Sequence, residues 1–227
     1  MPKIDQIIRS KRKTIALVVQ TDGKLIVRAP LRTTKKDIEQ LVQQQEDWIL
    51  KKQAEMLIRA KQNQPRLFVE KEEFYYLGHL YPLMIVNQAL ETLKFEKNTF
   101  RMTASLQPYG AQVFKEWYRV QAKRILTERV AYYAKKHGFQ YKKVRITSAS
   151  SRWGSYSTSG TLSFPWRLVM APIDMIDYVV VHELVHSRFQ NHSKDFWNGV
   201  AAIMPDYKER RKWFKLHGSQ LFLGGVK

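Results

Sequence analysis

The sequence predicts an α+β fold with two regions of different character. Residues 1–107 alternate short β-branched runs with a single long helical pattern, which indicates a β-rich region containing one long helix. In residues 108–227 helical patterns dominate and enclose a pair of strand-like runs. The cluster Pro108-Tyr109-Gly110 interrupts both patterns, so we expect the domain boundary there.

The first region begins with a predicted β-hairpin over residues 14–30, whose turn is the Asp22-Gly23 pair. A long amphipathic helix is expected over residues 35–62 because apolar residues recur there at near-helical spacing. These apolar positions are Ile38, Leu41, Val42, Trp48, Ile49, Met56 and Leu57.

Several short strands are expected next, over residues 73–102, where β-branched and aromatic residues gather. The pairs Gly78-His79 and Lys97-Asn98 are typical of turns between such strands. These strands complete the β-rich N-terminal region.

The second region opens with a long predicted helix over residues 111–138, and Gly138 is suited to end it. Two strand-like runs joined by a Ser/Gly-rich turn follow over residues 143–170. The next helix is expected from about Pro172, since proline is favoured in a first turn. Two further helices are expected over residues 194–204 and 206–217.

The chain is strongly basic, with 39 Lys and Arg against 20 Asp and Glu and a net charge of +19. Residues 106–227 carry +12 of this excess and residues 1–105 carry +7. A basic surface attracts polyanions over long range, so nucleic acids, nucleotides and acidic proteins are candidate partners. Solubility explains the same charge equally well, so charge by itself identifies no partner.

The chain contains no cysteine, which excludes a disulfide framework and limits any metal site to nitrogen and oxygen ligands. The first residues, MPKIDQIIRSKRK, lack the apolar segment of a signal peptide. No apolar run reaches the ~18 residues that a membrane-spanning helix needs. These observations lead us to expect a cytoplasmic protein with no membrane partner.

Residues 182–186 match the pattern H-E-x-x-H within an apolar helical run. The spacing places His182 and His186 one turn apart on the same helix face, where both can reach one ion. Glu183 lies about 100° further round the helix, displaced from the ligand position but able to face a water on the metal. The pattern predicts a zinc hydrolase with Glu183 as general base. The alternative is a buried helix with two core histidines.

Catalytic zinc sites use three protein ligands and keep one position open. His192 is the candidate for the third ligand, six residues after His186. Six helical residues rotate by about 600°, so the helix must end near Gln190-Asn191 for the chain to turn back. The pattern H-E-x-x-H-x-x-G-x-x-H has the same spacing, but Phe189 stands at its glycine position. The other histidines, expected at turns or helix ends, are His79, His137 and His217.

The segment from SSRWGSYS through VVVHELVHSRFQNHSKDFW, followed by MPDYKERRKWF, resembles the YgjP-like metallopeptidases, a zincin family distantly akin to SprT-like proteases. The resemblance covers about residues 114–214 and rests on four motifs in order. It implies a zincin-type catalytic domain in which a long helix and a small sheet precede the active-site helix and C-terminal helices. It also implies zinc bound by His182, His186 and His192, with Glu183 as general acid and base.

Members of that family commonly have cysteine where this chain has Tyr156, and the implied zinc ligands do not depend on it. Arg152 could bind a carboxylate or phosphate, or stabilise an oxyanion at the metal. The structural alternative is that its segment only packs, with Trp153 in the core and Gly154 in a tight turn. Asp195 could orient a ligand histidine or serve as a first-turn helix acid. The aromatic residues expected in the core are Trp166, Phe196 and Trp197.

Three functions follow from these observations. The favoured one is a zinc-dependent metallopeptidase that acts on a peptide or protein and uses a zinc-bound water activated by Glu183. A metal-dependent phosphoanhydride hydrolase acting on a nucleoside triphosphate would suit the basic second region, but the chain lacks a phosphate-cradling glycine loop. A nucleic-acid-associated accessory protein is supported by charge alone, without a recognised motif.

Overall fold

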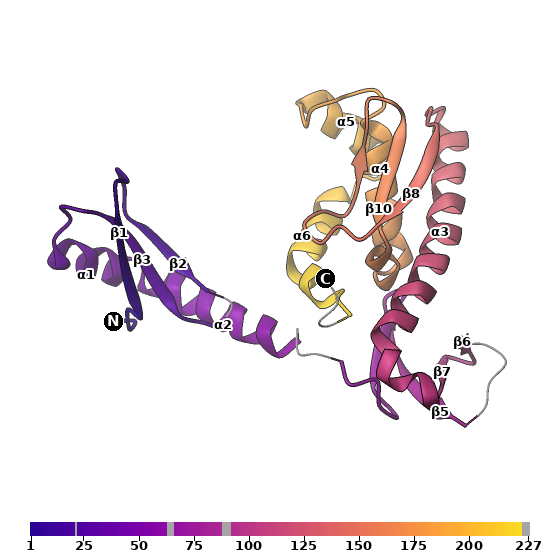
Figure 1. Ribbon diagram of the computed structural model, residues 1–227. Helices are drawn as coiled ribbons and strands as arrows, with labels where there is room; N and C mark the ends of the chain where they lie inside the picture. The colour runs from indigo at the N-terminus through magenta and orange to yellow at the C-terminus, as the bar shows by residue number, and fades with distance from the viewer. Residues whose placement is uncertain (21, 63–65, 88–91, 224–227) are drawn as a thin grey trace. The chain divides into compact units, whose positions relative to one another are not determined.

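The computed structural model describes residues 1–20, 22–62, 66–87 and 92–223. Helices and small sheets alternate along the chain, so the predicted α+β class is confirmed (Figure 1). The contacts divide the chain into an N-terminal unit, Met1–Gln64, and a C-terminal unit, Pro65–Lys227. Among the described residues, no helix combines the length and the apolar character required to cross a membrane.

The N-terminal unit packs a three-stranded sheet against helices. Its elements are β1 (Gln6–Ser10), β2 (Ala16–Val19), β3 (Leu25–Pro30), α1 (Lys35–Gln44) and α2 (Glu46–Gln62). β3 is the central strand, parallel to β1 and antiparallel to β2, so the expected hairpin is formed by β2 and β3. Gly23 occupies its turn with a φ of +85°, where a side chain would be strained.

The structure divides the single long helix that we expected over residues 35–62 into α1 and α2. The break falls at Gln45, the last of three consecutive exposed glutamines. Their side chains make no contact with the core that would stabilise a continuous helix here. Glu46 and Asp47 then begin α2, and acids are favourable at a helix N-terminus. Of the apolar positions predicted for this helix, Ile38, Val42 and Ile49 are in the core, whereas Trp48 and Leu57 are exposed.

The C-terminal unit begins with a four-stranded sheet. Its strands are β4 (Glu73–Tyr76), β5 (His79–Val86), β6 (Leu93–Glu96) and β7 (Thr99–Thr103), in the order β4-β5-β7-β6. The tight turns lie at Leu77-Gly78 and Lys97-Asn98, where all four residues have positive φ. The first turn therefore sits one residue earlier than the sequence indicated.

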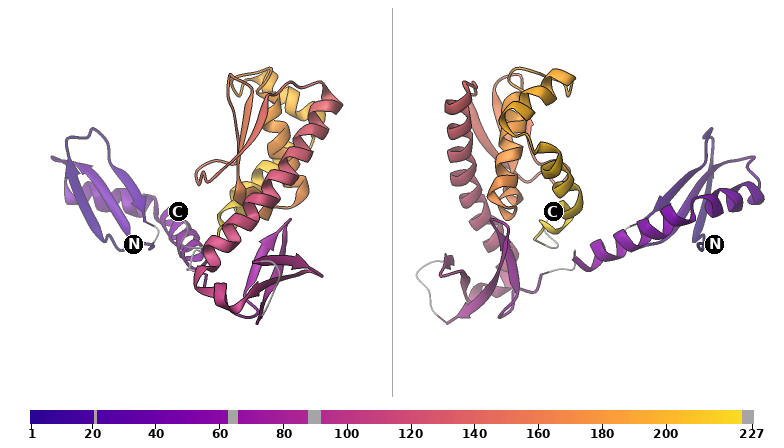
Figure 2. Two further views of the ribbon diagram at one scale, coloured as in Figure 1. Left: turned by 45° about the vertical axis from the view of Figure 1, so that its right-hand side comes forward. Right: turned by 180° about the vertical axis from the view of Figure 1, so that it is seen from behind.

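The rest of this unit is a long helix, a second small sheet and the helices that follow it. The elements are η1 (Ala104–Tyr109), α3 (Gly110–His137), β8 (Lys143–Thr147), β9 (Ser155–Tyr156), β10 (Thr161–Pro165), η2 (Trp166–Met170), α4 (Ile173–Val185), α5 (Lys194–Ile203), α6 (Tyr207–His217) and η3 (Gly218–Gln220). The strand order is β8-β10-β9, with β10 parallel to β8 and antiparallel to β9. The four-stranded sheet lies at the N-terminal end of α3, and β8 lies further along it (Figure 2).

The four-stranded sheet shares one core with α3, which explains why the units divide after Gln64 and not at the expected position 107/108. The Phe74 ring from β4 stacks on Phe114 of α3, with ring centroids 4.1 Å apart. The Leu77 N–H at the tip of the β4–β5 hairpin also donates to the Val169 carbonyl of η2, at 2.9 Å. The sheet therefore belongs with the helices that follow it.

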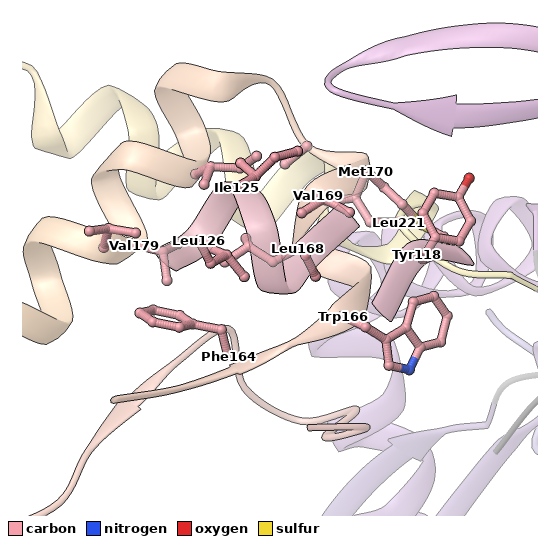
Figure 3. Packing of buried hydrophobic residues seen from close by; sticks show 14 of the residues in the cluster. Tyr118, Ile125, Leu126, Phe164, Trp166, Leu168, Val169, Met170, Val179 and Leu221 are labelled. Carbon is pink, nitrogen blue, oxygen red and sulfur yellow. The ribbon is translucent and has the colours of Figure 1, made fainter. Parts of the chain in front are cut away.

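Helix α4 is held in the middle of this core. Apolar side chains from α3, β10, η2 and α4, among them Leu126, Phe164 and Val179, interdigitate there (Figure 3). A polar link lies partly buried among them: Arg129 on α3 binds both carboxylate oxygens of the buried Asp177, with Nη2 2.6 Å from Oδ2. The Tyr133 hydroxyl donates to the same carboxylate at 3.1 Å. This link fixes α4, the helix carrying the H-E-x-x-H pattern, against α3.

Candidate metal centre

The three predicted ligand histidines lie together at the C-terminal end of α4. His182 belongs to the last turn of the helix, and His186 is its C-cap residue. His192 lies on the loop between α4 and α5. One ligand atom from each of the three side chains lies within 4.8 Å of the other two, so the cluster could hold a metal ion.

The chain turns back earlier than the sequence indicated. Helix α4 ends at Val185 and not near residue 190. The N–H groups of Ser187 and Arg188 bond to carbonyls three residues back, at 3.0 Å each, which tightens the turn. The Phe189 carbonyl lies 2.9 Å from His186 Nδ1. A carbonyl only accepts, so this contact fixes the proton on Nδ1 and leaves Nε2 of His186 free to bind a metal.

The donor geometry of the histidine cluster fits a metal ion, and the surroundings of His182 and His192 favour their neutral forms. Nε2 of His182 and Nε2 of His192 lie 3.0 Å apart. Two nitrogens bound to one tetrahedral zinc ion would be roughly 3.3 Å apart, given Zn–N bonds of about 2.0–2.1 Å. Burial lowers the pKa of His182 to about 3 and also lowers the pKa of His192, and neighbouring positive charges add to both shifts. Neutral imidazoles are the form that coordinates metal.

Aromatic side chains support the cluster from α5. Phe196 is fully buried, and its ring centroid lies 4.5 Å from that of His186 and 4.7 Å from that of His192. Trp197 stacks on His192 with ring centroids 5.6 Å apart. Phe196 and Trp166 are core residues, as expected, whereas Trp197 is half-buried and forms part of the wall around the site.

Glu183 is buried beside the cluster, facing β9 and the loop before it. The Tyr156 N–H donates to its carboxylate. Gly154 approaches so closely that a Cβ atom there would lie 2.5 Å from Glu183 Oε1. Burial raises the pKa of Glu183 to about 8, against the opposing effects of Arg152 and the Tyr156 N–H. The glycine is therefore needed for close approach to the carboxylate, and not for the tight turn that we considered.

Arg167 holds the loop that carries Arg152 and Gly154. Its guanidinium donates to the carbonyls of Ser150, at 2.9 Å, and Arg152, at 3.3 Å. It also lies over the Trp153 ring, 3.7 Å from the centroid. Desolvation lowers the pKa of Arg167 to about 10, still well above neutral pH. Arg167 thus fixes the backbone of this loop. The Arg152 side chain remains exposed and lies near enough to Glu183 to lower the pKa of that carboxyl.

The remaining predicted residues lie apart from the cluster. Asp195 is exposed in the first turn of α5, and no hydrogen bond joins its side chain to a ligand histidine within the described parts of the chain. His137 is the last residue of α3 and His217 the last of α6, as expected for helix ends. His79 opens β5 directly after the turn glycine.

A cleft of about 260 Å³ opens beside the cluster. His182, Glu183 and Tyr178 of α4 form one side, Trp153 and Gly154 another, and Arg211 and Phe214 of α6 the third. Arg211 could not be selected from the sequence, because an arginine in the basic helix KERRKWFK is typical of a solvated face. Only the fold brings α6 to the edge of the metal cluster.

Two comparisons with known proteins found matches. The model of a family described as "YgjP-like, metallopeptidase domain" matches residues 13–217. A similar solved structure is the crystal structure of the metallopeptidase zymogen of Pyrococcus abyssi abylysin, which is 24% identical with a TM-score of 0.37. That match covers 40% of this chain and 94% of the other. No curated protein matches the chain.

Proposed function

Because the chain belongs to the YgjP-like metallopeptidase family, we propose that it hydrolyses peptide bonds with a zinc ion held by His182, His186 and His192. The observation that carries the proposal is the convergence of three imidazoles beside one buried carboxylate, with His182 and Glu183 lining an open cleft. A three-histidine donor set without thiolates suits zinc, and a carboxylate that is not a ligand suits hydrolysis. When bound, zinc would polarise the scissile carbonyl and acidify a water molecule.

Glu183 has the properties of a proton carrier for this reaction. A carboxyl group whose pKa lies near neutrality can accept a proton and return it within one turnover. In peptide hydrolysis, Glu183 would take a proton from the attacking water as its oxygen bonds to the carbonyl carbon. It would then deliver that proton to the amine nitrogen as the C–N bond breaks. Gly154 and the Tyr156 N–H would hold the carboxylate in position through both steps.

Arg152 would act on the carboxylate electrostatically. Its positive charge favours the ionised form of Glu183 and so opposes the effect of burial. Its side chain is exposed at the end of the loop that Arg167 fixes, and could also approach a developing oxyanion on a bound substrate.

Replacing Glu183 with Gln tests the proposal. The amide keeps the size of the side chain but cannot accept the proton, so hydrolysis should fall by about 10²–10⁴-fold. The zinc content, measured by elemental analysis of the purified protein, should stay at the wild-type level. Glu128→Gln, an exposed change on α3, serves as the matched control and should leave both quantities unchanged. Full casein hydrolysis by the Glu183→Gln variant would refute the mechanism.

The other two functions considered from the sequence are hydrolysis of a nucleoside triphosphate and binding of nucleic acid. The family description concerns peptides and gives no support to nucleotides or nucleic acids. Phosphate release from nucleoside triphosphates, assayed beside casein hydrolysis with the same variants, separates the peptidase from the phosphoanhydride hydrolase. A peptidase should release no phosphate above the level of the Glu183→Gln protein.

A further inference from the structure

Arg211 is a cation of the cleft without an acidic partner in the described parts of the chain. It lies on α6 and lines the same cleft as His182 and Glu183. Its neighbour Arg210 differs, because its Nε binds Asp206 at 2.8 Å and its Nη1 donates to the Asp174 carbonyl. Arg210 is thus committed to holding α6 in place, whereas Arg211 presents an uncompensated positive charge to the cleft.

Aromatic rings hold Arg211 near the histidine cluster. Its guanidinium carbon lies 5.2 Å from the centroid of the Trp197 ring, within the range of a cation–π contact. Trp197 stacks on Tyr207, with ring centroids 5.1 Å apart. It also stacks on His192, with ring centroids 5.6 Å apart. The guanidinium therefore lies beside the candidate metal centre.

The other walls of the cleft lack a group that would neutralise this charge. Glu183 is the one acid in the lining, and it is buried toward Gly154 and β9. Trp153, Val179 and Phe214 supply apolar surface. A mostly apolar cleft with one exposed cation at its edge orients a ligand through the opposite charge.

We propose that Arg211 binds a carboxylate of the peptide substrate and so selects peptides that carry an acidic group beside the scissile bond. The inference rests on the proposed peptidase function and adds the substrate class that the cleft prefers. The carboxylate has two sources in peptides: an Asp or Glu side chain, or the free C-terminus. Arg211 is a specificity-determining residue in this scheme, and the proton carrier remains Glu183.

The test compares three pools of fluorogenic peptides that differ in one group. Peptides of the first pool have Glu beside the randomised cleavage positions and end in a C-terminal amide. Those of the second pool have Gln in place of Glu and the same amide. Those of the third pool have Gln and a free C-terminal carboxylate. The wild-type protein should cleave the first or the third pool with a kcat/KM about 10- to 100-fold above the second, the range of a charge-assisted hydrogen bond. Preference for the first pool identifies a side-chain carboxylate, and preference for the third identifies the C-terminus.

Arg211→Gln should abolish that preference mainly through KM, with zinc content unchanged. Lys212→Gln removes the same charge from the next residue of α6, which is exposed and absent from the cleft lining, and should retain the preference. A preference that survives in Arg211→Gln, or the lack of any preference in the wild type, would overturn the assignment.

A binding experiment separates this inference from the proposed function. Fluorescence anisotropy with dye-labelled peptides from the same pools measures affinity for the Glu183→Gln protein, with and without Arg211→Gln. If no pool is cleaved but carboxylate peptides bind more tightly only when Arg211 is present, the peptidase proposal fails and the subsite stands. If peptides are cleaved and bound with no dependence on Arg211, the subsite fails and the peptidase stands.

Discussion

The contact between Gly154 and Glu183 shows how one small residue determines the position of a catalytic group. A Cβ atom at Gly154 would meet three atoms of the Glu183 side chain at 2.5–2.7 Å. Such distances are well inside van der Waals contact, so either the loop or the carboxylate would have to move. Arg167 and the packing of Trp153 hold the loop, which leaves the carboxylate as the part that yields.

We therefore predict that Gly154→Ala lowers peptide hydrolysis by about 100-fold, the effect of displacing a catalytic group by roughly 1 Å. The three atoms nearest to the added Cβ all belong to Glu183 and none to a candidate ligand histidine, so zinc content should not change. Ser151→Ala, an exposed change in the same loop, should behave like the wild type. Steady-state kinetics and elemental analysis on both variants check this; normal kcat in Gly154→Ala would contradict it.

At the level of single residues, the sequence predicted the groups that follow a fixed spacing and missed those that depend on tertiary approach. His182, His186 and Glu183 could be selected because helical geometry fixes their relative directions. His192 could be selected because a third ligand was required. The close approach of Gly154 and the location of Arg211 involve segments 29 and 28 residues from Glu183, and no local pattern encodes such contacts.

At the level of elements, the differences between expectation and structure lie at helix ends, which residue spacing alone does not specify. Helix α4 ends at Val185 because the following turn is closed by short backbone bonds and by the contact of His186 Nδ1 with the Phe189 carbonyl. Residue spacing indicated that the chain must turn before His192, but it could not place the end of the helix. The break between α1 and α2 was missed for a related reason, since periodicity continues across the exposed glutamines.

The attachment of α4 to α3 leads to a prediction at the same scale. Asp177→Asn removes the charge that Arg129 binds, leaving a partly buried guanidinium without its partner. We expect a loss of about 2–3 kcal/mol in the free energy of unfolding, less than for a fully buried pair because Arg129 keeps some contact with water. Urea denaturation measures this loss. The control is Asp174→Asn, an exposed change in the first turn of α4, which should cost under about 0.5 kcal/mol.

At the level of the whole molecule, the two units have separate hydrophobic cores. Leu25, Val27 and Ile38 belong to the core of the N-terminal unit, and the helices around the candidate metal centre to the other. The family match at residues 13–217 nevertheless spans both units, well beyond residues 114–214 where the resemblance could be recognised from the sequence. The motifs around the site contain histidines and aromatic residues at specific spacings, which can be recognised in a single sequence. The sheet and helices of the N-terminal unit carry only apolar patterns that many folds share.

We predict that a fragment of residues 65–227 folds on its own and binds zinc with the stoichiometry of the full chain. Its core and all three candidate ligands lie within that range. Circular dichroism during heating should give a cooperative transition, and elemental analysis should give equal zinc per chain. A fragment of residues 108–227, cut at the boundary expected from the sequence, should fail to fold because it loses Phe74 and its partners against Phe114. Cooperative unfolding of the shorter fragment would contradict the structural division.

The division of the candidate ligands between a helix and a loop has a consequence for the stability of this part of the fold. An ion shared by His182 and His192 would be a reversible cross-link that ties two points ten residues apart. The unfolded chain does not hold these side chains together, so the ion would bind the folded form and its binding free energy would add to the free energy of unfolding. Helix α4 and its C-cap would contribute two preorganised donors. The loop through Phe189 would supply the third, and the affinity for the ion would determine how firmly this loop is held against the helix.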